Sequence, residues 1–134
     1  MSDLYDFGVK VLLNQPFSVL LGTQLDKFVE GEAVLSLEVR EELKQQHGFV
    51  HGGVVSYLAD NALTYAGGSV LGDSVTAEYK INYLRPAIGH RLVATARVVS
   101  SGEKQAVCSC EVVALVDSGE KLVAVAQGTI AKIG

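Results

Sequence analysis

Residues 51–68 read HGGVVSYLADNALTYAGG, and this stretch decides how the rest of the chain is arranged. It has the length of one helix with a glycine pair at each end, and apolar side chains cover most of its circumference. A helix that is apolar nearly all round is buried, and this one is too short and too closely bounded by glycine to span a membrane. We therefore expect a central helix that the rest of the chain encloses and that ends at Gly67-Gly68.

One polar stripe runs along this predicted helix. Ser56, Asp60 and Thr64 are spaced four residues apart, so their side chains lie on one face. An acid inside an apolar helix is costly to bury without a partner, and the stretch contains no Lys or Arg. Asp60 is therefore the first candidate for a functional residue.

The segments on either side of the helix predict an α+β fold. Residues 3–13 carry apolar residues at helical spacing and stop shortly before Pro16, which predicts a short N-terminal helix. The other segments alternate between apolar and polar residues and are separated by turns, most of which contain glycine. These predicted strands span residues 17–28, 31–39, 74–84, 90–100, 104–117 and 121–132. The order of elements predicts one domain, residues 1–134, in which an antiparallel β-sheet wraps around one long central helix.

The composition narrows the classes of function. The chain has a net charge of −4 and no run of basic residues, which disfavours nucleic-acid binding. Its hydrophobic content of 49% is high for 134 residues and indicates a buried subunit interface, and therefore a homo-oligomer. No basic and apolar leader follows Met1, so we expect neither a signal peptide nor a membrane partner. Cys108 and Cys110 lack the further ligands of a zinc site, so we predict reduced thiols, no metal, no cofactor and a cytoplasmic location.

Two motifs carry a resemblance to a known family. The first is Gly48-x-x-His51-Gly52-Gly53, followed by Asp60 nine residues after the histidine. The second is the run YKINYLRPA at residues 79–87. Together with the order of elements, these motifs resemble the hotdog fold and, within it, the phenylacetyl-CoA (PaaI-like) thioesterase family. The resemblance covers roughly residues 15–131 and implies an enzyme that hydrolyses an acyl-CoA substrate.

The resemblance implies catalytic roles for matching positions. Asp60 matches the family's catalytic acid, which acts as a general base on water or as the nucleophile. The backbone N–H of Gly52 or Gly53 matches the donor to the oxyanion, and a helix N-terminus does offer free N–H groups with a partial positive charge. Gln45 stands where some members have an asparagine that contacts the thioester, and Thr76 matches a hydroxyl that places the water.

The remaining candidate residues are expected to bind or position the substrate. His51 is interpreted as a residue that fixes the start of the helix rather than as a reacting group. Gln46 is an alternative to Gln45 as the site amide. Arg85 is the preferred contact for the phosphates of CoA, because it sits at the end of a predicted strand just before Pro86. The full set of predicted substrate-binding residues is His51, Gln46, Asn61, Thr64, Tyr83 and Arg85.

The spacing of the two catalytic features predicts a shared site. Gly53 and Asp60 are separated by roughly 10 Å along one helix, at about 1.5 Å per residue. One acyl carbon therefore cannot contact both features of the same chain. A second copy of the helix, running antiparallel, would bring its Asp60 beside the first Gly53. We therefore expect a two-fold dimer with two composite sites, either alone or within a dimer of dimers.

The sequence leaves two alternatives to the thioesterase interpretation. One is a non-catalytic hotdog domain that binds acyl-CoA in a regulatory role, although such a domain would have no need of Asp60. The other is a hotdog dehydratase or hydratase, whose acid and base pairs are spaced differently from the residues present here. The identity of the acyl group does not follow from the sequence.

Overall fold

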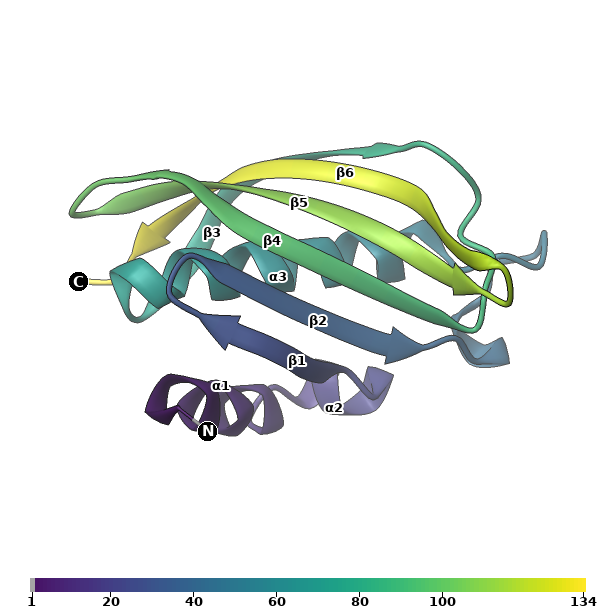
Figure 1. Ribbon diagram of the computed structural model, residues 1–134, viewed down its shortest axis with the longest axis horizontal. Helices are drawn as coiled ribbons and strands as arrows, with labels where there is room; N and C mark the ends of the chain where they lie inside the picture. The colour runs from purple at the N-terminus through teal and green to yellow at the C-terminus, as the bar shows by residue number, and fades with distance from the viewer. Residues whose placement is uncertain (1) are drawn as a thin grey trace.

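The apolar helix α3 (Gly52–Leu71) lies against the concave side of a curved six-stranded sheet, as a computed structural model of residues 2–134 shows (Figure 1). The sheet has the strand order β1-β2-β4-β5-β6-β3, and every neighbouring pair is antiparallel. The other elements are α1 (Asp3–Leu13), α2 (Pro16–Leu21), β1 (Gln24–Val29), β2 (Glu32–Glu38), a 3-10 turn (Glu41–Leu43), β3 (Ser74–Tyr83), β4 (Arg91–Ser101), β5 (Gln105–Val116) and β6 (Gly119–Lys132). The predicted α+β architecture, with one long helix inside an antiparallel sheet, is confirmed.

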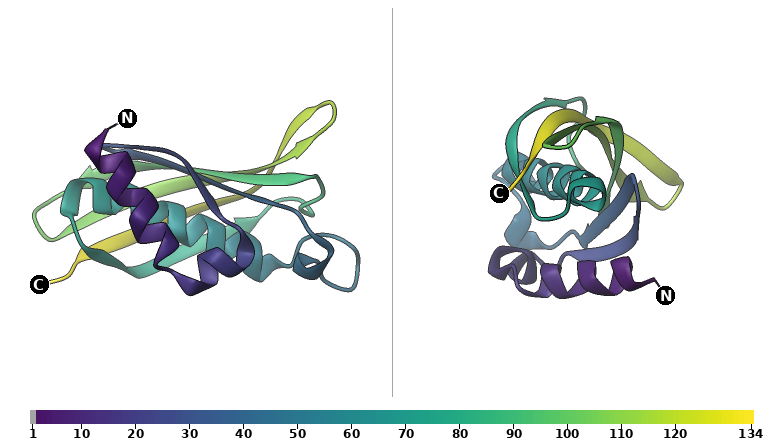
Figure 2. Two further views of the ribbon diagram at one scale, coloured as in Figure 1. Left: turned by 90° about the horizontal axis from the view of Figure 1, so that it is seen from below. Right: turned by 90° about the vertical axis from the view of Figure 1, so that its left-hand side faces the viewer.

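The core forms between α3 and the inward side chains of the sheet. The helix contacts all six strands, and the sheet curves around it in the right-hand view of Figure 2. Small residues on the helix allow this close approach: a Cβ added at Gly67 would lie 2.6 Å from the Cβ of Ile130 on β6. The alternating strands supply fully buried partners such as Leu35, Leu92 and Val112.

The enclosure of α3 is incomplete, which corrects the expectation of a helix buried on all sides. The sheet covers one side of the helix, while α1 and α2 pack below β1 (Figure 1). Between β3 and the N-terminal helices, one strip of α3 is half-buried or exposed in the single chain. The strip consists of Gly53, Ser56, Tyr57, Asp60, Asn61, Thr64 and Gly68.

The predicted strand over residues 17–28 is wrong in its first part, because residues 16–21 form the helix α2. Pro16 occupies the first turn, where its missing N–H is not needed, and Gly22 ends the helix with a φ of 73°. Apolar residues in a short run satisfy a strand pattern and a one-and-a-half-turn helix equally well. Strand β1 starts only at Gln24.

The predicted end of the central helix at Gly67-Gly68 is also wrong. The helix continues to Leu71 and ends at Gly72, which has a φ of 85° and donates its N–H to the carbonyl of Gly68. Gly67 is required for packing rather than for termination, and Gly72 supplies the positive φ at which the chain leaves the helix and which glycine adopts without strain.

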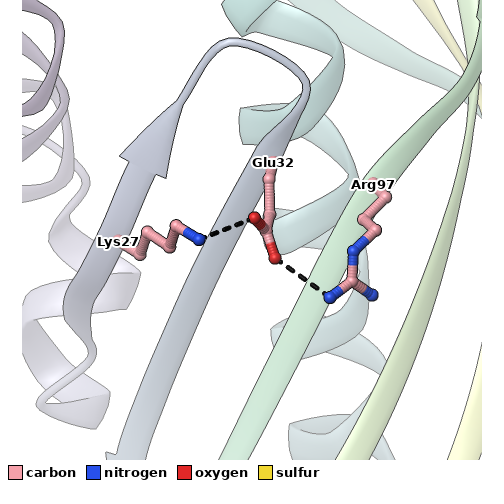
Figure 3. Close-up of polar contacts among 3 residues, drawn as sticks. All are labelled: Lys27, Glu32 and Arg97. Carbon is pink, nitrogen blue, oxygen red and sulfur yellow. Dashed lines mark hydrogen bonds and ion pairs between the residues drawn. The ribbon is translucent and has the colours of Figure 1, made fainter.

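A charged cluster joins β1, β2 and β4. Glu32 pairs with Lys27 at 2.8 Å and with Arg97 at 3.1 Å (Figure 3). The hydrogen bond from Lys27, together with the positive charge of Arg97, holds the pKa of Glu32 below its ordinary value. The pairs lie near the surface, so they contribute little to stability. They do occupy two cations that could otherwise contact an anionic ligand.

Cys108 and Cys110 both point into the core from β5 and are buried without a disulfide. Burial raises the pKa of Cys108 to about 11 and that of Cys110 to about 12. Both side chains are therefore protonated thiols at neutral pH and act as small apolar residues in the core. Within residues 2–134, no helix combines the length and apolar character needed to cross a bilayer.

Candidate active site

Strand β3 lies beside the polar stripe of α3 and supplies hydroxyl groups to it. A β-bulge lies between Thr76 and Glu78. Thr76 and Tyr79 are three residues apart and would face opposite sides of a regular strand, but the bulge turns both toward the helix. Three contacts result: Thr76 with Asp60, Tyr79 with Ser56, and Tyr83 with Gly52.

Asp60, Thr64 and Thr76 form the first half of the site. The Thr76 hydroxyl donates to Asp60 Oδ1 at 2.6 Å, and the hydroxyl oxygens of Thr64 and Thr76 are 2.7 Å apart. Asp60 Oδ2 accepts no hydrogen bond from residues 2–134, and none of the ion pairs in this part of the chain includes Asp60. The carboxylate is thus half-buried, oriented by one hydroxyl and free to accept a proton at its second oxygen.

The start of α3 forms the second half. His51 Nδ1 accepts the N–H of Gly53 at 2.8 Å and so caps the helix. The Tyr83 hydroxyl donates to the Gly52 carbonyl at 3.1 Å. The N–H of Gly52 has no hydrogen-bond partner among the residues that the structure describes. Of the two predicted donors to an oxyanion, Gly52 is therefore available and Gly53 is engaged by His51.

The two halves are far apart in one chain. Gly52 and Asp60 are eight residues apart on α3, which places them roughly 12 Å from each other at about 1.5 Å per residue. No hydrogen bond among residues 2–134 joins the two groups.

A hollow of about 330 Å³ adjoins the start of α3. Its walls include Gly52, Tyr83 and Arg85, so three predicted residues do come together here. The Arg85 guanidinium is exposed and donates to the carbonyl of Leu122 at 2.7 Å, with no carboxylate pairing to it among residues 2–134. An unneutralised cation at the rim of an apolar hollow suits an anionic end of an otherwise apolar ligand.

Gln45 and Gln46 lie in the loop before α3 and, among residues 2–134, form no hydrogen bond with either half of the site. The side-chain Oε1 of Gln45 accepts the backbone N–H of His47. The backbone N–H of Gln45 donates to the carbonyl of Phe49 at 3.0 Å. These bonds close the loop that leads into the helix. Gln46 is exposed.

Asn61 faces the opposite side of the strip from Thr76. Its amide donates to Gln15 at 3.2 Å and to the Tyr57 hydroxyl at 3.3 Å. Tyr57 in turn donates to Ser18 at 2.6 Å. This network between α2 and α3 was not foreseen from the sequence, because residues 17–28 read as a strand and Ser18 could not then be paired with the helix.

Comparison with known proteins identifies the family. A family model described as the thioesterase superfamily matches residues 47–121, which contain both halves of the site. The chain belongs to the thioesterase superfamily. The match includes His51, Gly52, Asp60 and Thr76 but not the N-terminal helices.

Relatives of this thioesterase-superfamily chain confirm the hotdog fold and the resemblance to PaaI-like proteins. The acyl-coenzyme A thioesterase PaaI of Escherichia coli is 33% identical over 90% of this chain and 85% of its own. A 1,4-dihydroxy-2-naphthoyl-CoA hydrolase of Listeria monocytogenes is 31% identical over 83% of this chain and 90% of its own. A thioesterase family protein from Silicibacter pomeroyi superimposes with a TM-score of 0.91 at 34% identity, over 97% of this chain and 99% of that one.

Proposed function

We propose that this protein hydrolyses acyl-CoA thioesters at two sites that are each shared between the chains of a two-fold dimer. Its family is a family of thioester hydrolases, and two of the relatives, from Escherichia coli and Listeria monocytogenes, are named for the hydrolysis of CoA thioesters. The main support for a shared site is the distance along α3 between the Asp60 carboxylate, which forms no ion pair within residues 2–134, and the free N–H of Gly52. An antiparallel second copy of α3 would place one chain's Asp60 beside the other chain's Gly52.

The proposed reaction uses the free atoms of both halves. Asp60 Oδ2 accepts a proton from a water molecule, and the water oxygen forms a bond with the thioester carbonyl carbon. The carbonyl oxygen becomes an oxyanion, which the Gly52 N–H of the other chain stabilises at the positive end of its helix. The C–S bond then breaks, and the CoA thiolate leaves and takes up a proton. Direct attack by Asp60 would pass through an anhydride instead, and oxygen-18 incorporation in a single turnover distinguishes the two routes.

The other candidate residues support these groups in our proposal. Thr76 orients the carboxylate, and Thr64 holds the Thr76 hydroxyl in place. His51 fixes the first turn of the helix and so the direction of the Gly52 N–H. Arg85 and Tyr83, at the hollow beside the helix start, contact the CoA portion. In this proposal, the substrate contacts Gln45, Gln46 and Asn61 only if the second chain forms part of the binding site next to them.

Removing the Thr76 hydroxyl is expected to slow hydrolysis without weakening binding. Thr76→Val deletes a hydrogen bond to an ionised group, and we expect kcat to fall about 10- to 100-fold while KM stays within about twofold. Thr76→Ser keeps the hydroxyl and should retain most of the activity. Steady-state kinetics of both variants provide the check; equal losses in the two variants would argue against an orienting role for the hydroxyl.

A panel of acyl-CoAs tests the activity itself. The wild-type protein is incubated with acetyl-, octanoyl-, phenylacetyl- and succinyl-CoA, and released CoA is measured with a thiol reagent. The two buried cysteines do not contribute to the signal, because their thiols are protonated and inaccessible in the folded protein. We expect CoA release from at least one substrate and none with Asp60→Asn. No release from any thioester would refute the proposed activity.

A further inference from the structure

Gly128 lies in the interior of β6, where a glycine is unfavourable. The strand pairs on one side with Cys108 of β5 and on the other with Tyr79 of β3, so β6 is an inner strand of the sheet. Glycine weakens the interior of a strand, because it has no side chain to pack and loses more conformational entropy on folding than other residues. Gly128 is also buried, so solvent does not explain its presence. The position therefore needs a local structural reason.

That reason lies on the β3 side of Gly128. A Cβ added there would lie 2.6 Å from the carbonyl oxygen of Glu78 and 2.6 Å from the Cβ of Tyr79. Directly opposite residues in a regular antiparallel pair keep their Cβ atoms about 4.5–5.5 Å apart. The two strands thus approach more closely here than a regular ladder allows for a residue with a side chain. One of the overlapping atoms belongs to the backbone, so a change of rotamer cannot relieve the contact.

The close approach coincides with the β-bulge in β3. The register with β6 jumps from Thr76 to Glu78, so Ala77 is an extra residue without a partner on β6. A bulge bends the strand that contains it and increases its local twist. Here the bend brings the Glu78 carbonyl over the position that Gly128 occupies. The glycine and the bulge therefore belong to one local arrangement of the two strands.

The bulge also decides which way the site residues of β3 point. Thr76 and Tyr79 are an odd number of residues apart, yet both reach α3, and the Thr76 hydroxyl donates to Asp60 at 2.6 Å. Without the extra residue, strand alternation would turn one of the two away from the helix. A side chain at position 128 would displace the Glu78 carbonyl and with it the bulge. The hydrogen bond to Asp60 therefore depends on the space beside Glu78.

We propose that Gly128 is a positioning residue of the active site. Its missing side chain leaves room for the bulge in β3, and the bulge aims the Thr76 hydroxyl at the Asp60 carboxylate. The effect on catalysis rests on the proposed function, since it acts through the same carboxylate. The structural half of the inference, that the bulge requires glycine at position 128, is testable without any activity.

The first experiment measures whether Gly128 and the bulge depend on each other. Gly128→Ala is made in the wild-type chain and in a chain that lacks Ala77, and the melting temperature of each protein is measured. In the wild type, we expect alanine to lower the melting temperature by about 5 °C or more, because the added Cβ overlaps with the backbone of β3. In the chain that lacks Ala77, β3 is regular, and we expect a change of less than about 2 °C.

The contrary outcomes of this stability cycle are definite. If alanine lowers the melting temperature equally in both chains, the glycine serves the core or the Tyr79 ring, and the inference is wrong. A wild-type chain that tolerates alanine, or a chain lacking Ala77 that does not fold, would also overturn it. If Gly128→Ala alone does not fold, the same substitution in the chain lacking Ala77 decides. A folded protein then supports the inference, and an unfolded one refutes it.

The second experiment measures whether the effect reaches the carboxylate through Thr76. We expect Gly128→Ala to lower kcat about tenfold or more with KM within about twofold, the pattern expected for Thr76→Val. In the Thr76→Val chain, the same alanine should lower kcat by less than about twofold, because the hydroxyl is already absent. Gly8→Ala is the matched control: its Cβ would lie 2.6 Å from the Phe28 ring, so it strains the contact of α1 with β1. We expect its kcat to stay within about twofold of the wild type.

Failure of the inference and failure of the proposed activity can be told apart. If alanine lowers kcat equally with and without the Thr76 hydroxyl, Gly128 does not act through it, and the inference is wrong while the thioesterase activity stands. If the wild type hydrolyses no thioester, the proposed activity fails, and crystal structures of wild type and Gly128→Ala judge the inference. We expect the distance from Thr76 Oγ1 to Asp60 Oδ1 to exceed about 3.5 Å in the variant. A hydrogen bond that persists there would overturn the inference.

Discussion

Asp60→Asn is expected to lower kcat for acyl-CoA hydrolysis by about 10³-fold, in line with the contribution of a positioned base. Asparagine has the same shape as aspartate, and its side-chain oxygen can still accept the Thr76 hydroxyl that now binds Oδ1. The loss would therefore come from the missing basic oxygen rather than from a displaced side chain. A 10³-fold change corresponds to roughly 4 kcal/mol of transition-state stabilisation.

The measurement is kcat by thiol release, accompanied by thermal unfolding and size-exclusion chromatography. We expect the unfolding temperature and the elution volume to match those of the wild type. Asp117→Asn is a suitable control, because Asp117 is exposed in the turn before β6 and is part of neither half of the site nor of the hollow beside it. A folded Asp60→Asn variant that keeps a tenth or more of the wild-type activity would remove Asp60 from the proposed mechanism.

Gly52→Pro is expected to lower kcat by about 10²- to 10³-fold, the effect of losing one donor to an oxyanion. Proline replaces the amide hydrogen with the ring Cδ, so it removes the donor and fills the place where the oxyanion would approach it. Gly52 is the first residue of α3, where proline is well tolerated, and His51 has a ψ of 134°, which suits a residue that precedes proline. A Cβ at Gly52 would lie 3.5 Å from the Tyr83 ring, which is an ordinary contact.

Gly52→Ala provides the matched control for this prediction. Alanine adds the same Cβ but keeps the N–H, so we expect it to retain most of the activity. The comparison separates the loss of the donor position from the effect of an added Cβ. Similar rates for the proline and alanine variants, with both folded, would show that the Gly52 N–H does not stabilise the oxyanion.

The fold could be predicted largely because periodicity acts over long segments. The hairpins were predicted correctly from the alternation of apolar and polar residues in 31–39 and 104–117. The central helix was predicted from the length of the apolar stretch after His51. The errors occurred where local patterns are short. Residues 17–21 fit both a strand pattern and a helix pattern. Pro16 in the first turn and the hydrogen bond between Ser18 and Tyr57 favour the helix.

For the candidate site, the sequence predicted which residues take part but not which of their atoms are free. The sequence indicated that Asp60 lies on one stripe with Thr64 and that glycines begin the helix. It could not show that Thr76 faces inward, because that depends on a β-bulge. Nor could it show which glycine N–H is free, because that depends on the orientation of the His51 ring. Backbone irregularities and side-chain rotamers are not encoded in hydrophobic periodicity.

The most direct test of the shared site combines the two inactive chains. In a heterodimer of Asp60→Asn and Gly52→Pro chains, one site has an intact Gly52 from the first chain and an intact Asp60 from the second, and the other site has neither. Random exchange at equal amounts yields about half heterodimers, so we expect recovery of about a quarter of the wild-type activity. Activity that stays at the level of the separate variants, while mass spectrometry of intact complexes shows that heterodimers have formed, would contradict the shared site.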